Sequence, residues 1–321
     1  PIMALAWGVL IGGIVQLLFQ IPFLIKIRKL PRLAHGDHPS VKTLKKRMLP
    51  ALFGVSVSQI NLLIDTMIAT VLVSGSVSWL YYSDRLLELP LALIGIALAT
   101  VALAKLSKHY ANKDEQKFTR TVDYALKVGL LLGAPACAGL LLLAEPLIIT
   151  LFQYEEFDAF AAHMSALSLT AYGSGLMAFI MVKILAPVFL ARGDTKTPVK
   201  VGVIAMVSNV FLNVIFAYYY AHVGLAIATS ISAVINASLL YYYLNKQSIY
   251  QFSDDLIKLF LKVLLASSIM VIFILNFSND INFYLENGVW QRITSVASTI
   301  IASAALYFAC LRLLGIRIKQ L

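Results

Sequence analysis

Apolar residues dominate nine long stretches of this chain, and short polar segments separate them. A bilayer core roughly 30 Å thick requires about 20 helical residues to cross, and each stretch reaches that length. The pattern therefore predicts an all-α integral membrane protein, a polytopic bundle of nine transmembrane helices. The expected spans are 3–25, 49–73, 77–105, 122–150, 161–190, 199–220, 222–244, 256–277 and 290–314.

Basic residues alternate along the loops between these stretches. The loop after the first stretch holds eight Lys or Arg residues between positions 26 and 47, whereas the segment 74–76 holds none. The third, fifth and seventh loops and the C-terminal end are basic, while the fourth and eighth carry acidic residues and no base. Because cytoplasmic loops concentrate Lys and Arg, we expect the N-terminal end outside and the C-terminus in the cytoplasm.

Composition narrows the function further. Of 321 residues, 60% are hydrophobic and 13% charged, which leaves little room for a soluble domain. The net charge of +10 comes mostly from bases beside the inner helix ends, so nucleic-acid binding is not expected. Cys137 and Cys310 lie inside apolar stretches without metal or disulfide spacing, and we assign them to packing. No catalytic motif is present, so we do not expect an enzyme.

One helical face in the stretch 77–105 concentrates charge at membrane depth. At 3.6 residues per turn, Tyr81, Asp84, Arg85 and Glu88 share this face. Arg85 lies about eight residues from the outer end, roughly 12 Å deep. Asp84 and Glu88 could serve only as counter-ions for Arg85. Alternatively, the guanidinium binds a phosphate or diphosphate bidentately in a polar cavity, and the acids temper that attraction.

A second set of polar residues recurs at helical spacing in three stretches. Counting from the outer ends puts Asp65, Asn213 and Thr229 at similar depth. With Asn209 and backbone carbonyls near Leu225, these groups suit a hard cation such as sodium. Ordinary interhelical hydrogen bonding is the alternative interpretation, and a proton on Asp65 would also serve. The set comprises Gly54, Ser58, Asn61, Asp65, Asn209, Asn213, Thr229, Ser232 and Asn236.

Two other charges inside or near apolar stretches are expected to be structural. Lys183 lies seven residues from the inner end of its stretch and can extend its ammonium toward the interface. Glu145 precedes Pro146 near the outer boundary. We therefore give neither residue a functional role on the sequence alone.

Four segments of the chain are distinctive: Gly54–Ile60, Tyr81–Pro90, Leu151–Tyr154 and the segment from Ala186-Pro187 to Asp194-Thr195-Lys196-Thr197-Pro198. Together they resemble the MurJ (MviN) family, the lipid II flippases of the bacterial inner membrane. This family belongs to the superfamily of multidrug and toxin extruders and polysaccharide-lipid exporters. The resemblance covers essentially the whole chain and matches helices six to fourteen of a fourteen-helix architecture.

The resemblance implies roles for particular residues and regions. It places Arg85 among the cavity arginines needed for transport, with Asp84 and Glu88 beside it in the same motif. Asp65, Asn209, Asn213 and Thr229 resemble the sodium-binding positions of some members. The implied organisation is a last N-lobe helix with a basic linker (1–48), a C-terminal lobe of six helices (49–244) and two helices forming a groove for the lipid tail (245–321).

The activity implied is transfer of lipid II from the inner to the outer leaflet by alternating access. The expected partners are lipid II, membrane lipids and the missing N-terminal lobe helices, in cis or on another chain. No cofactor or metal is expected beyond the sodium ion. The chain is expected to be a fragment that does not transport on its own. An exporter of another lipid-linked oligosaccharide, or a cation-coupled drug antiporter, is the alternative; a lipid-modifying enzyme and a structural helper are weaker ones.

Overall fold

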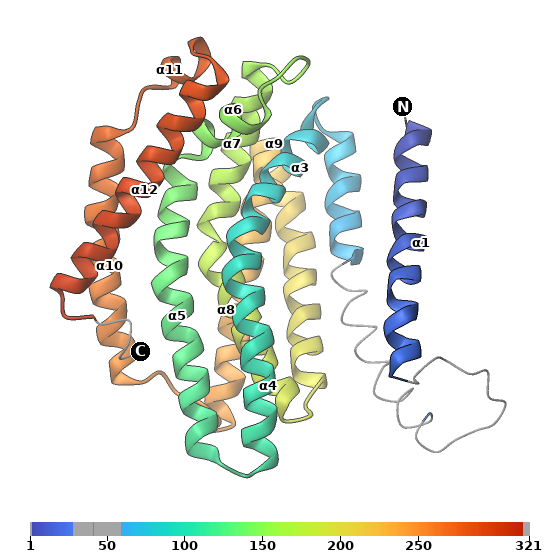
Figure 1. Cartoon of the computed structure of the whole chain (residues 1–321), viewed down its shortest axis with the longest axis vertical. Coiled ribbons are helices and arrows are strands. Elements are labelled where there is room, and N and C mark those ends of the chain that lie inside the picture. The colour runs from blue at the N-terminus through green and yellow to red at the C-terminus, as the bar shows by residue number, and fades with distance from the viewer. Residues whose placement is uncertain (1, 28–40, 42–58, 317–321) are drawn as a thin grey trace. The chain divides into compact units, whose positions relative to one another are not determined.

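The computed structural model describes residues 2–27, 41 and 59–316, and it divides the chain into two compact units, 1–48 and 49–321. The first unit contains α1 (Ile2–Lys26), a 25-residue apolar helix that ends at a lysine (Figure 1). The basic linker after α1 and the segment Gly54–Ser58 lie outside the described residues.

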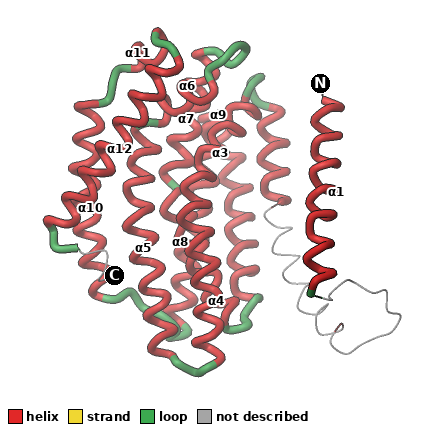
Figure 2. Tube along the Cα trace, viewed as in Figure 1, coloured by secondary structure: helices red, strands yellow, loops and turns green. Residues whose placement is uncertain are grey.

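The second unit is helical throughout its described part, without strands (Figure 2). It begins with the helix Gln59–Val71. The helices that follow are α3 (Ser76–Pro90), the π-helix η1 (Leu91–Ile96), α4 (Ala97–Ala111), α5 (Glu115–Leu142), α6 (Ala144–Phe152), α7 (Ala159–Ser174), α8 (Leu176–Ala191), α9 (Lys196–Lys246), α10 (Asp254–Phe277), α11 (Ile281–Glu286) and α12 (Val289–Leu313).

Six described helices are long and apolar enough to cross a membrane, and a seventh span results if α7 and α8 count as one. The chain is therefore a multi-pass helical membrane protein, but the expected number of nine spans is not confirmed. The difference has two sources. The expected span 49–73 begins among residues that the structure does not describe, and α9 counts once although it covers two expected spans.

The helix α9 is a hairpin of two arms. Its 51 residues would extend roughly 77 Å if straight, far more than a bilayer requires. Ala221 has φ 48° and ψ −130°, outside the helical region. Asn209 donates to Thr229 (3.2 Å), and Ser232 donates to the carbonyl of Ala205 (2.7 Å). Ala205 contacts Ser232, and Asn209, four residues later, contacts Thr229, three residues earlier. The two arms therefore run antiparallel on either side of Ala221.

The expected span 122–150 is not one continuous helix in the structure. The structure ends α5 at Leu142 and starts α6 at Ala144, with Leu143 at φ −105° and ψ 17° between them. Pro146 explains the break, because a proline inside a continuous helix lacks the N–H for the carbonyl four residues earlier and clashes with it. In the first turn of α6 the same residue is tolerated.

The helices α7 and α8 meet at Gly175 with a bend of 44°. A Cβ atom at Gly175 would lie 2.8 Å from the Cα atom of Ser230 on α9, closer than real side chains approach. Ser230 donates a hydrogen bond of 2.8 Å to the carbonyl of Ala171 at the same crossing. The glycine therefore allows α9 to pack directly on the bend.

Helix α8 forms the centre of the second unit, where it packs on α4, α5 and α9. Its residues Leu185 and Phe189 are fully buried. Helix α3 packs on α7, and α10 packs on α5 and α12. Side-chain caps begin three of these helices: Asp114 for α5, Asp158 for α7 and Ser253 for α10.

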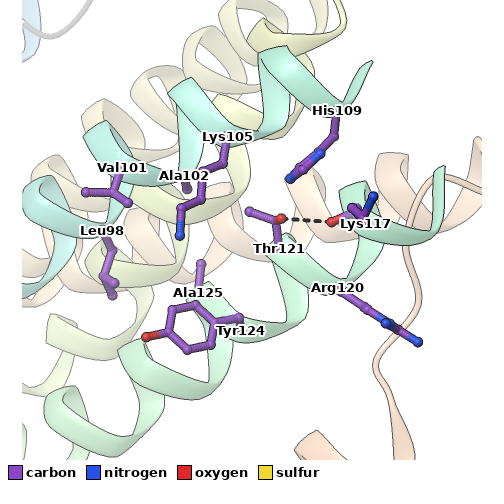
Figure 3. A pocket seen from close by; sticks show the side chains of 10 residues that line it. All are labelled: Leu98, Val101, Ala102, Lys105, His109, Lys117, Arg120, Thr121, Tyr124 and Ala125. Carbon is purple, nitrogen blue, oxygen red and sulfur yellow. Dashed lines mark hydrogen bonds between the residues drawn. The ribbon is translucent and has the colours of Figure 1, made fainter. Parts of the chain in front are cut away.

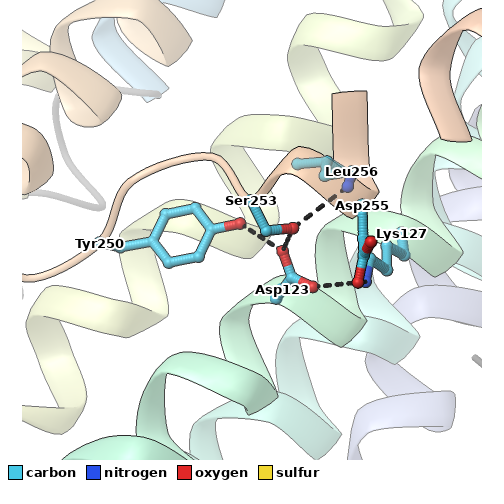
Figure 4. A network of polar contacts seen from close by, with 6 residues as sticks. All are labelled: Asp123, Lys127, Tyr250, Ser253, Asp255 and Leu256. Atoms are coloured by element: carbon cyan, nitrogen blue, oxygen red, sulfur yellow. Dashed lines mark hydrogen bonds and ion pairs between the residues drawn. The ribbon is translucent and has the colours of Figure 1, made fainter. Parts of the chain in front are cut away.

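A polar network attaches the start of α10 to α5 (Figure 4). Asp123 on α5 accepts hydrogen bonds from the Tyr250 hydroxyl (2.8 Å) and the Ser253 hydroxyl (2.6 Å). Lys127, one turn further along α5, pairs with the other Asp123 oxygen at 2.7 Å. Burial, and then the hydrogen bond to Asp123, raise the pKa of Tyr250 well above its usual range. The phenol thus remains a donor at any physiological pH.

We predict that Gly175→Ala destabilises the second unit. The added methyl group would overlap the backbone of Ser230, and such overpacking typically costs about 1–3 kcal/mol. Thermal unfolding of the purified protein in detergent measures the change. Gly139→Ala is the matched control, because nothing lies within 4 Å of a Cβ there. Equal unfolding temperatures for both variants would contradict the close crossing.

We also predict that Asp123→Ala loosens the start of α10. The change leaves Tyr250, Ser253 and Lys127 without their shared acceptor, and unsatisfied buried groups cost about 1–3 kcal/mol each. The unfolding temperature and the rate of proteolysis between α9 and α10 report the effect. Asp255→Ala is the control, since Asp255 is 77% exposed and 3.9 Å from Lys127; its cost should stay below about 1 kcal/mol. Identical proteolysis rates in the two variants would refute the role of Asp123.

Candidate functional site

Helix α3 presents one charged face and buries the opposite one. Ser83 is fully buried, and its hydroxyl lies 2.6 Å from the carbonyl oxygens of Trp79 and Ser165. Leu86 and Leu87 are also buried. Because this side of α3 is held against α7, the side carrying Arg85 faces away from the core of the unit.

The structure brings Tyr81, Arg85 and Glu88 together on the exposed face of α3. The Nη1 atom of Arg85 donates to Glu88 at 2.7 Å, and the guanidinium carbon lies 4.9 Å from the centre of the Tyr81 ring. The side chains of Arg85 and Glu88 are 50% and 52% exposed. A paired but accessible guanidinium has further N–H donors available for a planar oxyanion.

Asp84 was expected on the same face as Arg85, but its surroundings differ. It is half-buried, and it forms no ion pair or hydrogen bond within the described part of the chain. On the helix it sits about 60° from the centre of the exposed face, since each residue advances roughly 100°. Asp84 therefore lies at the border of the face rather than beside Arg85.

The polar residues expected to bind sodium converge in space although they are far apart in sequence. Asp65, on the helix Gln59–Val71, accepts hydrogen bonds from Asn213 and from Asn61. Asn213 also donates to Asn209 (2.9 Å). The first arm of α9 and a separate helix thus meet at one carboxylate.

The same network reaches the backbone of α9. The Asn209 amide contacts the Thr229 hydroxyl at 3.2 Å, and Thr229 donates to the carbonyl of Leu225 at 2.9 Å. Rotating the Asn209 amide by half a turn lets its nitrogen donate to Asp65 and Asn61. The Asn213 carbonyl oxygen is buried without a hydrogen-bond partner in the described structure. Amide nitrogens therefore donate to the Asp65 carboxylate, and the carbonyl oxygen of Asn213 stays unsatisfied beside them.

The arrangement contains one carboxylate and several neutral oxygens. Within the described ranges no three His, Cys, Asp or Glu residues lie close enough to share a metal ion. One negative charge with neutral oxygen donors matches a monovalent hard cation better than a divalent one. Asn61 is also part of this network, because its amide donates to Asp65. The spacing of four residues, which places both side chains on one helical face, is the sequence feature that indicates this contact.

A cavity of about 430 Å³ opens between α8 and the two arms of α9. Asn61, Asn209 and Thr229 connect it to the Asp65 network, and Lys183 contributes a charged group from α8. Arg85 is not among its lining residues. Arg85 on α3 and this cavity are therefore separate features of the described unit.

An apolar groove of about 740 Å³ runs along α5, α8 and α10. Leu130, Met181 and Phe260 represent the three helices in its lining. The family resemblance implies that the last two spans form a groove for a lipid tail. In the structure α10 lines this groove with α5 and α8, and α12 supplies none of its described lining residues.

A basic notch of about 340 Å³ lies where α4 and α5 meet (Figure 3). Lys105, His109, Lys117 and Arg120 surround it. Lys117 is paired with Asp114 at 2.8 Å. These bases belong to the loop that the charge pattern expects in the cytoplasm, where phospholipid head groups are anionic.

Glu145, expected to be structural, forms a close contact with His163. The Glu145 carboxylate lies 2.9 Å from the His163 ring, between the first turns of α6 and α7. The other expected structural charge, Lys183, lies in the middle of α8 and is exposed. It lines the cavity between α8 and α9, a position that the sequence alone did not indicate.

Comparison with known proteins defines the class. The structure is similar to an outward-facing MATE transporter of the MOP superfamily, with a TM-score of 0.56 and 20% identity, over 82% of this chain and 62% of that one. This likeness shows the helix-bundle fold of that transporter class. A solved structure of lipid II flippase MurJ in an inward closed conformation aligns with a TM-score of 0.68 and 26% identity, over 89% of this chain and 59% of that one.

The family model "Lipid II flippase MurJ" matches residues 1–290. A probable lipid II flippase MurJ of Vibrio cholerae is 46% identical over the whole chain. The chain belongs to the lipid II flippase MurJ family. It spans 61% of the length of the Vibrio relative.

Proposed function

We propose that this chain is part of a lipid II flippase of the bacterial inner membrane, with its N-terminal end in the periplasm and its C-terminus in the cytoplasm. The single observation that carries the proposal is the match of the MurJ family model to residues 1–290. The protein moves the lipid-linked peptidoglycan precursor from the inner to the outer leaflet by alternating access. As a transporter it returns the lipid chemically unchanged.

Arg85 binds the diphosphate of the substrate in this proposal. Its guanidinium lies within a membrane-spanning segment on an exposed face, and its exchangeable partner Glu88 orients it. Phosphate oxygens compete with Glu88 for the same N–H donors. Tyr81 supports the guanidinium from the ring face, while Asp84 borders the face and limits how tightly the anion is held.

The apolar groove along α5, α8 and α10 accommodates the polyprenyl tail. Its lining is almost wholly hydrocarbon, so it provides no partner for a polar head group. The head crosses through polar surroundings while the tail stays in an apolar environment, which avoids the large cost of transferring either part into the wrong medium.

A sodium ion bound at Asp65 couples to this movement. The carboxylate of Asp65, the amide oxygens of Asn209 and Asn213, the Thr229 hydroxyl and the Leu225 carbonyl are the proposed donors. The unsatisfied Asn213 oxygen supports the proposal, because a cation supplies the partner it lacks. Protonation of Asp65 is the competing form of coupling.

An exporter of another lipid-linked oligosaccharide, or a cation-coupled drug antiporter, remains the second candidate. The likeness to MATE transporters at 20% identity concerns the fold alone. Competition of unlabelled lipid II against a cationic drug for the purified protein separates these candidates.

We predict that Arg85→Ala strongly reduces flipping in the protein expressed from its complete gene. Charge-assisted hydrogen bonds are worth about 1.5–3 kcal/mol, so lipid II binding should weaken roughly tenfold or more. Arg85→Lys should recover part of it, since lysine keeps the charge but not the planar fork. Exposure of lipid II in the outer leaflet measures flipping.

Arg120→Ala, an exposed arginine of the basic notch, serves as the control and should leave flipping unchanged. Normal flipping by well-expressed Arg85→Ala protein would remove Arg85 from the substrate contact.

We predict that sodium stabilises the unsubstituted protein and that Asp65→Asn abolishes this effect. A ligand at 100 times its dissociation constant stabilises the folded state by about 2.7 kcal/mol. Thermal unfolding in sodium chloride against choline chloride detects it. Asp84→Asn is the control, because it removes a carboxylate from α3 and leaves the Asp65 network intact. Sodium stabilisation that persists in Asp65→Asn would reject this ion site.

A further inference from the structure

Lys183 is a charged residue that the sequence analysis assigned to structure, and its position argues for a larger role. It lies in the middle of α8 (Leu176–Ala191), eight residues from Ala191, or about 12 Å along the helix. The ammonium is the one charged group that the described residues contribute to the cavity between α8 and α9. Within the described structure it has no ion-pair partner.

The direction of the Lys183 side chain is set by its contact with η1. A Cβ atom at Gly95 would lie 3.4 Å from Cγ and 3.5 Å from Cβ of Lys183. The absence of a side chain at Gly95 lets the lysine stem pass close to the π-helix. The stem is therefore held beside the backbone, and the ammonium is available to the cavity.

The rest of the cavity lining is uncharged and polar on one side. Asn61, Asn209, Thr229, Ser232 and Asn236 supply amides and hydroxyls, and no Asp or Glu is among the described lining residues. A cation without a counter-ion at membrane depth indicates a functional partner by default. Amides and hydroxyls beside it suit the sugar and phosphate oxygens of a lipid-linked saccharide.

We propose that Lys183 is an anion-binding residue for the diphosphate of the lipid-linked substrate, at a position distinct from that of Arg85. This inference rests on the proposed function. Gly95 follows Arg85 by ten residues, roughly 15 Å along the helix axis. The two cations therefore serve successive positions on the transport route, Arg85 on the open face of α3 and Lys183 within the cavity.

The test measures binding of lipid II to the purified protein expressed from its complete gene. Lys183→Gln should weaken binding about tenfold, and Lys183→Arg should keep most of it because the charge is retained. Lys258→Gln, an exposed lysine of α10, is the control and should bind normally. Unchanged binding by Lys183→Gln would overturn the role of Lys183 alone, whereas failure of the unsubstituted protein to bind lipid II would overturn the proposed function.

A second variant covers the case in which Lys183→Gln does not fold. Lys183→Cys, in a background without other reactive thiols, is treated with 2-aminoethyl or 2-sulfonatoethyl methanethiosulfonate. The ammonium-bearing reagent should restore lipid II binding, and the sulfonate should not. Ile184→Cys, at a position only 1% exposed, should stay unmodified. An unreactive thiol at position 183, or equal binding after both reagents, would refute the proposal.

Discussion

The structure depends on the cost of leaving a polar group without a partner in hydrocarbon. Each such group must bond to the protein, reach water or hold a ligand. In the second unit several of them bond to distant segments: Ser83 of α3 to α7, Ser232 across the α9 hairpin, and Asn213 to Asp65. Because these partners are specific, they also set which helices lie beside one another. Hydrophobic surface alone could not do so in a bilayer, where lipid tails are as apolar as leucine.

The interruptions of the helices are what create polar chambers between them. The π-helix after Pro90 brings Gly95 against Lys183, the bend at Gly175 admits α9, and the reversal at Ala221 returns Thr229 to Asn209. A straight helix satisfies its own backbone and leaves no opening. Short departures from helical geometry therefore occur where side chains of different helices must converge, as π-bulges often do at functional positions.

The groups left without protein partners are as informative as those that are paired. Asn213 has an unsatisfied buried oxygen, and Lys183 has no counter-ion in the described structure. An unsatisfied oxygen can accept a cation, and an unpaired ammonium can bind an anion. Lys183 lines the cavity between α8 and α9, and Asn213 adjoins it through its hydrogen bond to Asn209.

The sequence by itself determined the membrane class, the family resemblance and the helical faces of Arg85 and Asp65, because hydropathy and spacing are local properties that survive without coordinates. It also predicted that Asp65, Asn213 and Thr229 share one depth. Only the tertiary structure decided that Asp84 is half-buried without a partner among the described residues, that the chain breaks at Leu143, that α8 rather than α12 lines the apolar groove, and that Lys183 lines a cavity. Those outcomes depend on which helix packs against which, and that choice follows from contacts between residues far apart along the chain.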